Sequence, residues 1–527
     1  MSLTESTYPS SAEPNPNPLS VPKFPALTII SHPMMTRAGD RLLLEGRGEV
    51  AVARGDSEFR RPGQPSGAPL EDPYLSRTPF HLTPLPGGGV RLRVDKDGIP
   101  VSVGGRPISG EEEFQPEALA RGVPLVLRKR IVLLLHLAER DGTAPGGELG
   151  MVGNSPGLRL VRAQIRDVAK LDAAVLIRGE TGTGKERVAQ ALHDHSSRQG
   201  QFVAVNLATI PETLATAELF GARRGAFADL RVDRKGLFRE AQGGTIFLDE
   251  IGETLDHVQS ILLRALETRK AIPLGDDKAV KLDARVIAAT DANIEARIGA
   301  GTFRAPLLYR LQAFEIHLPP LRERLEDLGL LFTHFARNEL EPLDQVGRLK
   351  PQEPNGEPWL PADLALLMLA YPWPGNVREL RNMVQQLIIN NRGRASLAVD
   401  GKLLEKLNSK PLVDISRPST SPEASLDKES TPRRGTRRYT REELLEALRA
   451  CRFEIAATAD QLGLVRGTLQ NRLRQYGIRT SADLKSDEII DAYRACDGNL
   501  ERMVTQLEVS GMALRPLLKT LGLEPDE

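Results

Sequence analysis

Short apolar stretches alternate with turn-forming segments through the first quarter of the chain. The apolar stretches lie at residues 27–30, 41–44, 90–94 and 131–135, and segments rich in Gly and Pro separate them. Apolar runs of strand length between turn residues are typical of an all-β sandwich. We therefore predict a β-sandwich over residues 25–140.

The pattern changes to strand followed by helix after about residue 150. Four further apolar runs have the length and flanks of buried strands, and helical patterns follow them: residues 175–177, 202–205, 246–248 and 285–289. Repeated strand–helix units predict a parallel sheet covered by helices. We expect this α/β domain over residues 150–320 and a helical segment over residues 321–405.

Helical periodicity near the C-terminus occurs as a repeated unit. Residues 443–451 recur as residues 488–496, an offset of 45, and the register continues without gaps through the leucines that follow. We predict an all-α end made of two helical repeats, at residues 440–479 and 485–525. The chain is therefore a multidomain protein with a sandwich, an α/β domain and a helical end.

The overall composition is that of an ordinary globular protein. The 527 residues carry 70 basic and 70 acidic side chains, a net charge of 0, which excludes a chain-wide basic coat for nucleic acid. Two segments rich in Ser, Pro and polar residues, 1–24 and 411–439, are predicted to be a disordered leader and a linker. The longest apolar run, near residues 131–138, is shorter than the about 18 residues of a membrane span. We therefore expect a cytoplasmic protein that does not bind membranes.

A glycine-rich loop follows the strand predicted at residues 175–177. It matches the phosphate-loop pattern Gly-x-x-x-x-Gly-Lys, with Glu186 where Ser or Thr usually ligates magnesium. Its glycines let backbone N–H groups surround phosphate oxygens, while Lys185 reaches the β- and γ-phosphates. The predicted nucleotide-binding residues are Gly179, Glu180, Thr181, Gly182, Thr183, Gly184, Lys185 and Glu186.

A pair of carboxylates supplies the other groups that nucleotide hydrolysis requires. Asp249 and Glu250 end the apolar strand predicted at residues 246–248. Asp249 can hold Mg²⁺, and Glu250 can polarise the attacking water. Together with the phosphate loop, this pair favours an ATPase that uses ATP and Mg²⁺ over a passive nucleotide binder.

Residues 150–400 resemble the AAA+ domain of bacterial enhancer-binding proteins, the ring ATPases that activate sigma-54 RNA polymerase. That family characteristically has Glu after the phosphate-loop lysine, as at Glu186. Further matching stretches are Glu-Leu-Phe-Gly at 218–221, Leu-Pro-Pro-Leu-Arg-Glu-Arg at 318–324 and Trp-Pro-Gly-Asn-Val-Arg-Glu-Leu at 373–380. The resemblance implies an AAA+ core with a helical lid over residues 321–405.

The resemblance also implies roles for individual residues. Asn206 would restrain the catalytic glutamate until the ring is primed, and Thr290 would sense the γ-phosphate. Arg304 and Arg310 match arginines that enter the neighbouring subunit's site, and Arg378 matches a nucleotide sensor on the lid. A guanidinium supplied in trans makes hydrolysis depend on assembly. The resemblance itself implies a hexamer-like ring as the active species.

Two positions depart from the family's pattern. The partner-contacting loop of the family reads Gly-Ala-Phe-Thr-Gly-Ala, whereas this chain has Gly225, Ala226, Phe227, Ala228, Asp229 and Leu230. The tip thus loses a hydroxyl group and gains a charge and a bulky side chain. The family's Asn after the sensor threonine is Asp291 here. A carboxylate beside a polyphosphate is repulsive unless a cation neutralises it, and we expect slow hydrolysis.

The first C-terminal repeat resembles the Fis-type helix-turn-helix that ends this family. A candidate recognition helix at residues 465–476 turns Leu469 and Leu473 inward. Residues 433–479 contain eleven Arg and five acidic residues, a local charge of +6, which suits the DNA backbone. The outward side chains suited to base edges and phosphates are Arg466, Gln470, Asn471 and Arg474.

The two repeats differ in how well they are suited to DNA binding. Pro516 lies inside the second repeat's counterpart of the recognition helix, where it removes an N–H donor, so we expect that repeat to pack or dimerise. Cys451 and Cys496 occupy equivalent positions, where we expect small buried side chains. Two cysteines exclude a disulfide framework and lack the spacing of a zinc site.

The N-terminal sandwich resembles a forkhead-associated domain, a fold that binds phosphothreonine. Arg54 and Ser76 stand near the positions of that family's Gly-Arg and Ser-Arg pairs, whereas Ile99 and Pro100 replace its Asn-Gly pair. The resemblance implies Arg54 and Ser76 as phosphopeptide ligands. The alternative is a purely structural sandwich.

These features together predict an ATP-hydrolysing, ring-forming transcriptional regulator. Its expected partners are an upstream DNA site, RNA polymerase with sigma-54 and a phosphothreonine protein. The altered loop tip motivates an alternative: a DNA-bound scaffold or repressor, or a regulator of the housekeeping polymerase, in which ATP controls assembly alone. A third hypothesis, an AAA+ loader acting on DNA, is disfavoured by the Fis-type end.

Overall fold

A computed structural model gives the fold of the chain. It describes residues 22–46, 48–140, 149–226, 232–350, 356–408, 441–451, 453–462, 469, 473, 486–507, 509–521 and 523. The chain forms two compact units, Met1–Pro418 and Ser419–Glu527, described separately below. No helix in the described ranges is long and apolar enough to cross a membrane.

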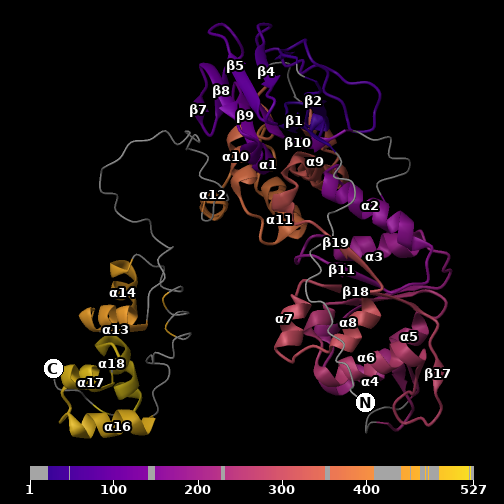
Figure 1. Cartoon of the computed structure of the whole chain (residues 1–527), viewed down its shortest axis with the longest axis vertical. Helices are drawn as coiled ribbons and strands as arrows, with labels where there is room; N and C mark the ends of the chain where they lie inside the picture. Colours follow the sequence, from indigo (N-terminus) through magenta and orange to yellow (C-terminus); the bar gives the residue numbers. More distant parts are fainter. Residues whose placement is uncertain are drawn as a thin grey trace, which may run out of the picture. The chain divides into compact units, whose positions relative to one another are not determined.

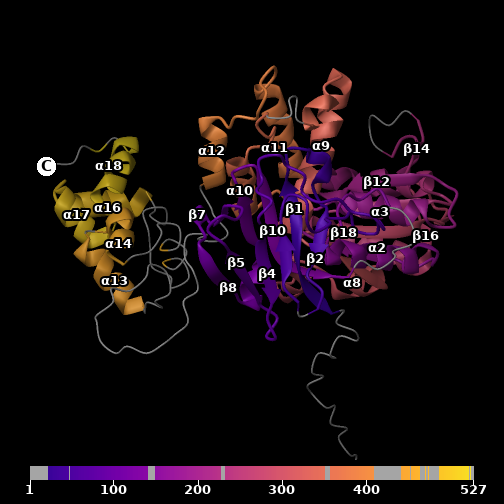
Figure 2. The same ribbon diagram turned by 90° about the horizontal axis from the view of Figure 1, so that it is seen from above.

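The N-terminal part is a sandwich of two antiparallel sheets, with strand orders β2-β1-β10-β9-β6-β7 and β3-β4-β5-β8 (Figure 2). The β-sandwich prediction agrees with this arrangement, and the four predicted apolar stretches are β1, β2, β5 and β10. The strands and the short helix are β1 (Lys23–Ser31), β2 (Arg41–Leu43), β3 (Val50–Val52), β4 (Phe80–Pro84), β5 (Val90–Val94), β6 (Val101–Val103), β7 (Arg106–Pro107), β8 (Gly110–Phe114), α1 (Pro116–Arg121), β9 (Val123–Leu127) and β10 (Ile131–Glu139).

The first strand begins earlier than predicted. Lys23 and Phe24, assigned to the leader, pair with Glu139 and Ala138 at the end of β10. The early start depends on this partner strand, which lies more than a hundred residues away in sequence, so local composition does not reveal it. Residues 1–21 lie outside the described ranges.

The middle of the first unit is a five-stranded parallel sheet with the order β12-β15-β18-β11-β19. All four strands predicted here are confirmed, but β19 was missed because only one of its four residues is fully buried. The strands are β11 (Val175–Arg178), β12 (Phe202–Asn206), β15 (Thr245–Asp249), β18 (Arg285–Thr290) and β19 (Phe314–His317). The helices and small hairpin strands are α2 (Pro156–Ala169), α3 (Lys185–Asp194), α4 (Ala215–Phe220), β13 (Gly221–Ala222), β14 (Arg234–Lys235), α5 (Leu237–Glu240), α6 (Asp256–Thr268), β16 (Lys270–Ala271), β17 (Val280–Lys281), α7 (Ile294–Gly299) and α8 (Ala305–Leu311).

A helical lid follows the sheet, as predicted. Its helices are α9 (Leu328–Leu340), α10 (Ala362–Ala370), α11 (Asn376–Asn390) and α12 (Gly401–Asn408). The lid shares one hydrophobic core with the sandwich, and β1 and β10 lie against α9 and α10 (Figure 1). The sandwich is thus joined to the α/β domain through the lid.

The second unit contains both predicted helical repeats. The first has α13 (Arg441–Ala450) and α14 (Ile455–Gln461), with Leu469 and Leu473 buried against them as predicted. The second has α16 (Ser486–Ala495), α17 (Leu500–Leu507) and α18 (Gly511–Thr520), and α18 runs through Pro516. The equivalence of the two cysteines extends to their contacts, because the Sγ atoms of Cys451 and Cys496 donate to Gln461 and Gln506. Cys496 is buried as expected, whereas Cys451 is only half-buried.

Candidate functional site

The phosphate loop connects β11 to α3 at the carboxyl edge of the parallel sheet. Gly182 and Gly184 have φ angles of 80° and 109°, a backbone region that glycine enters without strain. Lys185 begins α3 directly after the loop, and its Nζ donates to the Gly179 carbonyl oxygen at 2.9 Å. The curled backbone, the helix N-terminus and the lysine together fit the phosphates of a nucleotide.

The two predicted carboxylates lie at the end of the neighbouring strand β15. The Glu250 N–H donates to Asp249 Oδ1 at 3.0 Å, and Glu250 has a φ of 55°, an uncommon conformation for a non-glycine residue. Burial, opposed by Lys185 and reinforced by Asp291, raises the pKa of Glu250 to about 7. Burial also raises the pKa of Asp249. Such groups at a strand end are typical of a catalytic site.

The donor set at this edge fits Mg²⁺. Asp249 is half-buried beside the loop, and Glu186 is exposed in the first turn of α3. Carboxylate oxygens, completed by phosphate oxygens and water, are the ligands that Mg²⁺ prefers. Asp249 is therefore the residue best placed to hold the ion with a bound nucleotide.

The Asp291 side chain reaches the phosphate loop, whereas the predicted sensor Thr290 contacts the loop through its backbone carbonyl oxygen, which accepts from the Gly179 N–H at 3.2 Å. Thr290 is 1% exposed, and its hydroxyl oxygen accepts from the Ala292 N–H at 3.0 Å. Asp291 Oδ2 instead accepts from the Thr181 hydroxyl at 2.5 Å. Burial would raise the pKa of Asp291, but hydrogen bonds with Thr181 and Glu250 lower it. The side chain that departs from the family's pattern thus faces the nucleotide site.

Asn206 lies next to the carboxylates without bonding to Glu250. Asn206 of β12 pairs with Asp249 of β15, so the two strand ends are neighbours. Its Oδ1 atom accepts from the Ala208 N–H at 2.9 Å and caps the short helix that follows. A restraining contact between Asn206 and Glu250 remains a prediction for another state of the site.

The lid contacts the phosphate loop directly. Arg378, the predicted sensor, donates its backbone N–H to the Gly182 carbonyl oxygen at 3.2 Å. A Cβ atom on Gly182 would lie 2.3 Å from the Gly375 carbonyl oxygen, so only glycine fits beneath the lid. The Arg378 charge also acts on Asp249, whose pKa it lowers against the larger effect of burial.

Two further lid contacts were not predicted from the sequence. Arg322 forms a two-pronged ion pair with Glu180 at 2.6 and 2.8 Å. Fully buried Asn376 donates from Nδ2 to Glu180 Oε2 and to the Thr181 carbonyl oxygen, both at 3.1 Å. Its Oδ1 atom accepts from the Leu321 N–H at 2.8 Å. Both residues stand in family-matching stretches, which was the available signal.

The two predicted trans-acting arginines lie on the surface at α8. Arg304 caps the helix and pairs with Asp256 through two contacts of 2.7 Å, while Arg310 lies 3.9 Å from Glu267. Their side chains are 43% and 58% exposed. Neither contacts the phosphate loop of its own chain in the described residues, and this is the placement that action on a neighbouring subunit requires.

The base of the partner loop is a small hairpin. Gly221 and Ala222 pair with Lys235 and Arg234, and Arg223 bridges Asp233 and Asp276. Gly225 and Ala226 lie at the described edge of the loop, where the Ala226 N–H donates to the Arg223 carbonyl oxygen. Phe227 and the altered tip, residues 228–230, lie outside the described ranges, as do the predicted DNA-contacting residues Arg466, Gln470, Asn471 and Arg474.

The candidate phosphopeptide residues lie on two adjacent sandwich loops. The Arg54 N–H donates to the Ser76 carbonyl oxygen at 3.4 Å, and Arg54 Nη1 reaches the Pro73 carbonyl oxygen at 3.5 Å. Ser76 Oγ accepts from the Thr78 N–H at 3.0 Å. The structure therefore brings the two predicted residues together.

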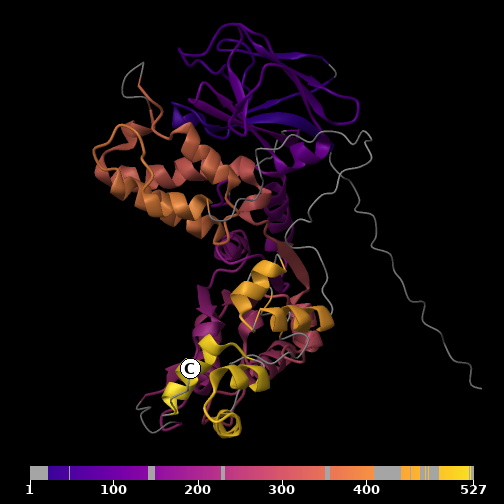
Figure 3. The same ribbon diagram turned by 90° about the vertical axis from the view of Figure 1, so that its left-hand side faces the viewer.

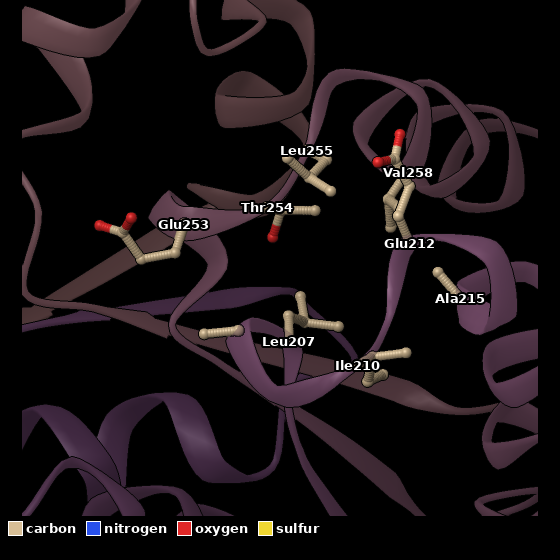
Figure 4. A pocket seen from close by; sticks show the side chains of 9 residues that line it. Leu207, Ile210, Glu212, Ala215, Glu253, Thr254, Leu255 and Val258 are labelled. Atoms are coloured by element: carbon tan, nitrogen blue, oxygen red, sulfur yellow. The ribbon is translucent and has the colours of Figure 1, made fainter.

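A cavity of about 300 Å³ lies beside the nucleotide site, between the segment that follows β12 and the segment that follows β15 (Figure 4). Its lining combines apolar side chains with the carboxylates of Glu212 and Glu253 and the hydroxyl group of Thr254. The lining residues are Leu207, Ala208, Ile210, Glu212, Ala215, Glu253, Thr254, Leu255 and Val258. It contains no predicted site residue.

Sequence profiles of three known domains match the chain. The sigma-54 interaction domain matches residues 151–317, and the AAA+ ATPase lid domain matches residues 322–400. The bacterial regulatory protein domain of the Fis family matches residues 441–476.

Similar proteins cover most of this architecture. The C4-dicarboxylate transport transcriptional regulatory protein DctD of Pseudomonas aeruginosa is 37% identical over 371 residues, which span 70% of this chain and 73% of that protein. The regulatory protein AtoC of Escherichia coli is 36% identical over 331 residues, 62% of this chain and 67% of that protein. Among solved structures, NtrX from Brucella abortus in complex with ATP is 31% identical, with a TM-score of 0.43 over 63% of this chain and 70% of that chain.

Proposed function

This chain belongs to the family of sigma-54-dependent transcriptional regulators, and we propose that it hydrolyses ATP in a ring assembly and regulates transcription from a DNA site. One observation carries the proposal. The phosphate loop, the Asp249–Glu250 pair and the lid residue Arg378 meet at the carboxyl edge of a parallel sheet. Ligands of such sheets bind at this edge.

In this proposal the loop backbone and Lys185 hold the phosphates of ATP, and Asp249 holds Mg²⁺. Glu250 accepts a proton from water as the water oxygen bonds to the γ-phosphorus and the bond to the ADP oxygen breaks. A pKa of about 7 makes this carboxylate a base of useful strength at neutral pH. Asp291 adds negative charge beside the phosphates, which favours slow turnover.

The assembly part of the proposal assigns Arg304 and Arg310 to the site of a neighbouring subunit. Their exposure on α8 supports this assignment. We expect Arg310→Ala to lower hydrolysis without weakening ATP binding, and wild-type turnover per subunit to rise with protein concentration. Turnover that is independent of concentration down to dissociated subunits would contradict the trans assignment.

A pair of lysine variants tests the active site. Lys185→Ala should lower steady-state ATP hydrolysis about a hundredfold, because it removes a charged phosphate ligand. Lys170→Ala is the matched control, since Lys170 is an exposed residue at the end of α2. Equal hydrolysis by Lys185→Ala and wild type would refute the assignment.

The sigma-54 part of the proposal rests on the family and on the preserved hairpin beneath the partner loop. The alternative, a DNA-bound scaffold or repressor or a regulator of the housekeeping polymerase, is favoured by the tip Ala228-Asp229-Leu230. A reconstituted assay of open-complex formation by sigma-54 polymerase separates the two. Opening by wild type supports sigma-54 activation. ATP hydrolysis without opening, with opening restored by the triple change Ala228→Thr, Asp229→Gly and Leu230→Ala, supports the alternative.

DNA binding is assigned to the first C-terminal repeat. The buried leucines of α13 and its neighbours support a helix-turn-helix, and the local charge of +6 supports contact with phosphates. Arg466→Ala should weaken binding to an upstream site in a fluorescence-anisotropy titration. Arg494→Ala in the second repeat is the control, and equal losses from both variants would contradict the assignment.

The sandwich is assigned to signal reception, with a phosphothreonine segment as its ligand. The adjacency of Arg54 and Ser76 favours this role. A phosphothreonine peptide should bind to the whole chain in calorimetry, its unphosphorylated form should not, and Arg54→Ala should abolish binding. Arg121→Ala, an exposed change on α1, serves as the control. Equal binding of both peptide forms would leave the sandwich a structural element.

A further inference from the structure

We propose that the β-sandwich is a permanent part of the ATPase lid, and that the combined body positions the phosphate loop through Asn376. The inference rests on the nucleotide-binding function proposed above and adds its regulation. Nucleotide affinity would depend on how the sandwich packs against the lid, so a signal could reach the phosphate loop without the sandwich leaving the lid.

The sandwich and the lid share a hydrophobic core rather than a surface contact. Its sandwich members are at most 4% exposed: Ile30, Met35, Ala38, Val126, Val132 and Leu134. The same cluster contains residues of three lid helices: Leu331 and Phe332 of α9, Leu364 and Met368 of α10, and Leu380 and Val384 of α11. Detachable domains usually meet through smaller and more polar interfaces. A shared core of this kind indicates that the two parts fold together.

The backbones of the two parts approach closely at Gly329 of α9. A Cβ atom on Gly329 would lie 2.2 Å from the Ile30 carbonyl oxygen of β1, so only glycine permits this packing. Side-chain hydrogen bonds surround the contact. Ser31 Oγ donates to the Leu360 carbonyl oxygen at 3.1 Å, and the Thr333 hydroxyl, which donates to the Gly329 carbonyl oxygen at 2.8 Å, lies 3.3 Å from the Met35 carbonyl oxygen. Figure 3 shows the sandwich, in indigo, directly over the lid helices, in orange.

A second contact ties the far end of the sandwich hairpin to the lid. Arg130 Nη1 donates to the Gly356 carbonyl oxygen at 3.1 Å, and Arg130 Nε pairs with buried Asp72 at 3.0 Å. The Arg130 guanidinium also stacks over the Tyr74 ring, 4.4 Å from its centre. Asp72 and Tyr74 belong to the loop that carries Ser76. The loop assigned to phosphopeptide binding is therefore linked to the lid through one arginine.

The lid needs this partner because α10 is almost entirely apolar. Every residue of α10 except Asp363 is hydrophobic, and the helix contacts α12 of the lid and the strands β1, β9 and β10 of the sandwich. A lid without the sandwich would expose a contiguous apolar surface, which soluble domains avoid. Loss of the sandwich contact should therefore disorder the lid.

The start of α11 connects the shared core of the sandwich and the lid with the phosphate loop. Residues of α9 and α11 pack within the shared core, and α11 begins at Asn376. Asn376 bonds to Glu180 and Thr181 of the loop, while Arg378 bonds to Gly182. A lid displaced by the loss of its sandwich would withdraw these groups. We therefore expect weaker nucleotide binding, and Asn376 acts as a positioning residue rather than a catalytic one.

The test is a Gly329→Ala variant of the full chain, with Gly347→Ala as the matched control. Alanine favours a helix more than glycine does, so α9 itself is not weakened, but the new methyl group forces β1 away from the helix. Gly347 is an exposed lid glycine with nothing within 4 Å of its Cβ position. A milder variant, Met35→Ala, loosens the same contact from the sandwich side. Two readouts are measured: hydrogen exchange of β1 and α9, and the Kd for a fluorescent ADP analogue.

In Gly329→Ala we expect faster hydrogen exchange in β1 and α9 and a Kd for the ADP analogue raised about fivefold or more. Both effects should be smaller in Met35→Ala and absent in the control. Faster exchange with unchanged affinity would overturn the inference while leaving the proposed ATPase function intact. Unchanged exchange in Gly329→Ala would contradict the close packing on which the inference rests. A wild-type chain that does not bind the analogue would instead refute the proposed function.

Discussion

Asn376 offers the sharpest test of the contact between lid and phosphate loop. The change Asn376→Ala removes three hydrogen bonds from a fully buried side chain. The Leu321 N–H and the Thr181 carbonyl oxygen then lose a partner inside the protein, at about 1 to 3 kcal/mol for each unsatisfied group. Asn376 also has a φ of 50°, and alanine tolerates this region less well than asparagine, at about 1 kcal/mol. Because Glu180 keeps its ion pair with Arg322, we expect a total loss of about 3 to 7 kcal/mol in the free energy of unfolding of the lid.

Tryptophan fluorescence during urea denaturation measures this loss selectively. The chain has two tryptophans, Trp359 and Trp373, which are 3% and 1% exposed in the shared core of the lid. The midpoint should fall in Asn376→Ala with an unchanged slope. Gln386→Ala, an exposed change within the same helix, is the matched control. Equal midpoints for the two variants would show that the hydrogen bonds of Asn376 do not stabilise the lid, and the reasoning above would be wrong.

Three further predictions concern the catalytic carboxylates, the shared core and the second repeat. The kcat for ATP hydrolysis should rise with pH around a midpoint near 7 as Glu250 ionises. Asp291→Asn should lower that midpoint, because it removes a negative charge beside Glu250. An unchanged midpoint in the pH–rate profile would exclude this coupling. Phe332→Ala, at a fully buried core position, should lower the free energy of unfolding by about 3 to 5 kcal/mol and speed hydrogen exchange in β1 as well as in α9. Faster exchange in α9 alone would indicate that the sandwich and the lid unfold separately. Pro516→Ala restores a helical N–H donor within α18 and should add up to about 3 kcal/mol to the free energy of unfolding of the C-terminal unit. Its thermal midpoint should therefore rise, and a lower midpoint in calorimetry would contradict this.

The strands and the phosphate loop could be predicted because their signals are local. β11 and β15 are short apolar runs that stay buried on both faces of the sheet, so composition alone marks them. Gly182 and Gly184 are required by backbone angles within the loop itself. β19 lacks this signal, since its position depends on pairing with β11 and only Ile316 is fully buried.

The partners of individual site residues could not be read in the same way. Thr290 and Asp291 are adjacent in sequence, and the turn at the end of β18 decides which of the two side chains faces the phosphate loop. Asn206 lies beside Asp249 because β12 pairs with β15, yet its side chain caps the next turn. Side-chain direction at a strand end depends on the backbone that follows, which a motif does not specify.

The sequence by itself determined which segments form sheets and helices, where phosphate can bind and which family the chain resembles, because periodicity, glycine positions and short motifs act within a few residues. Only the tertiary structure decided that the sandwich and the lid form one core and that Glu180 meets Arg322 and Asn376 beneath it. The physical reason is that the sequence of an apolar face, such as that of β1 or α10, does not specify which other face of the chain packs against it. Packing of complete surfaces, with contacts as close as that of Gly329 to Ile30, selects the partner among all the faces that the chain offers.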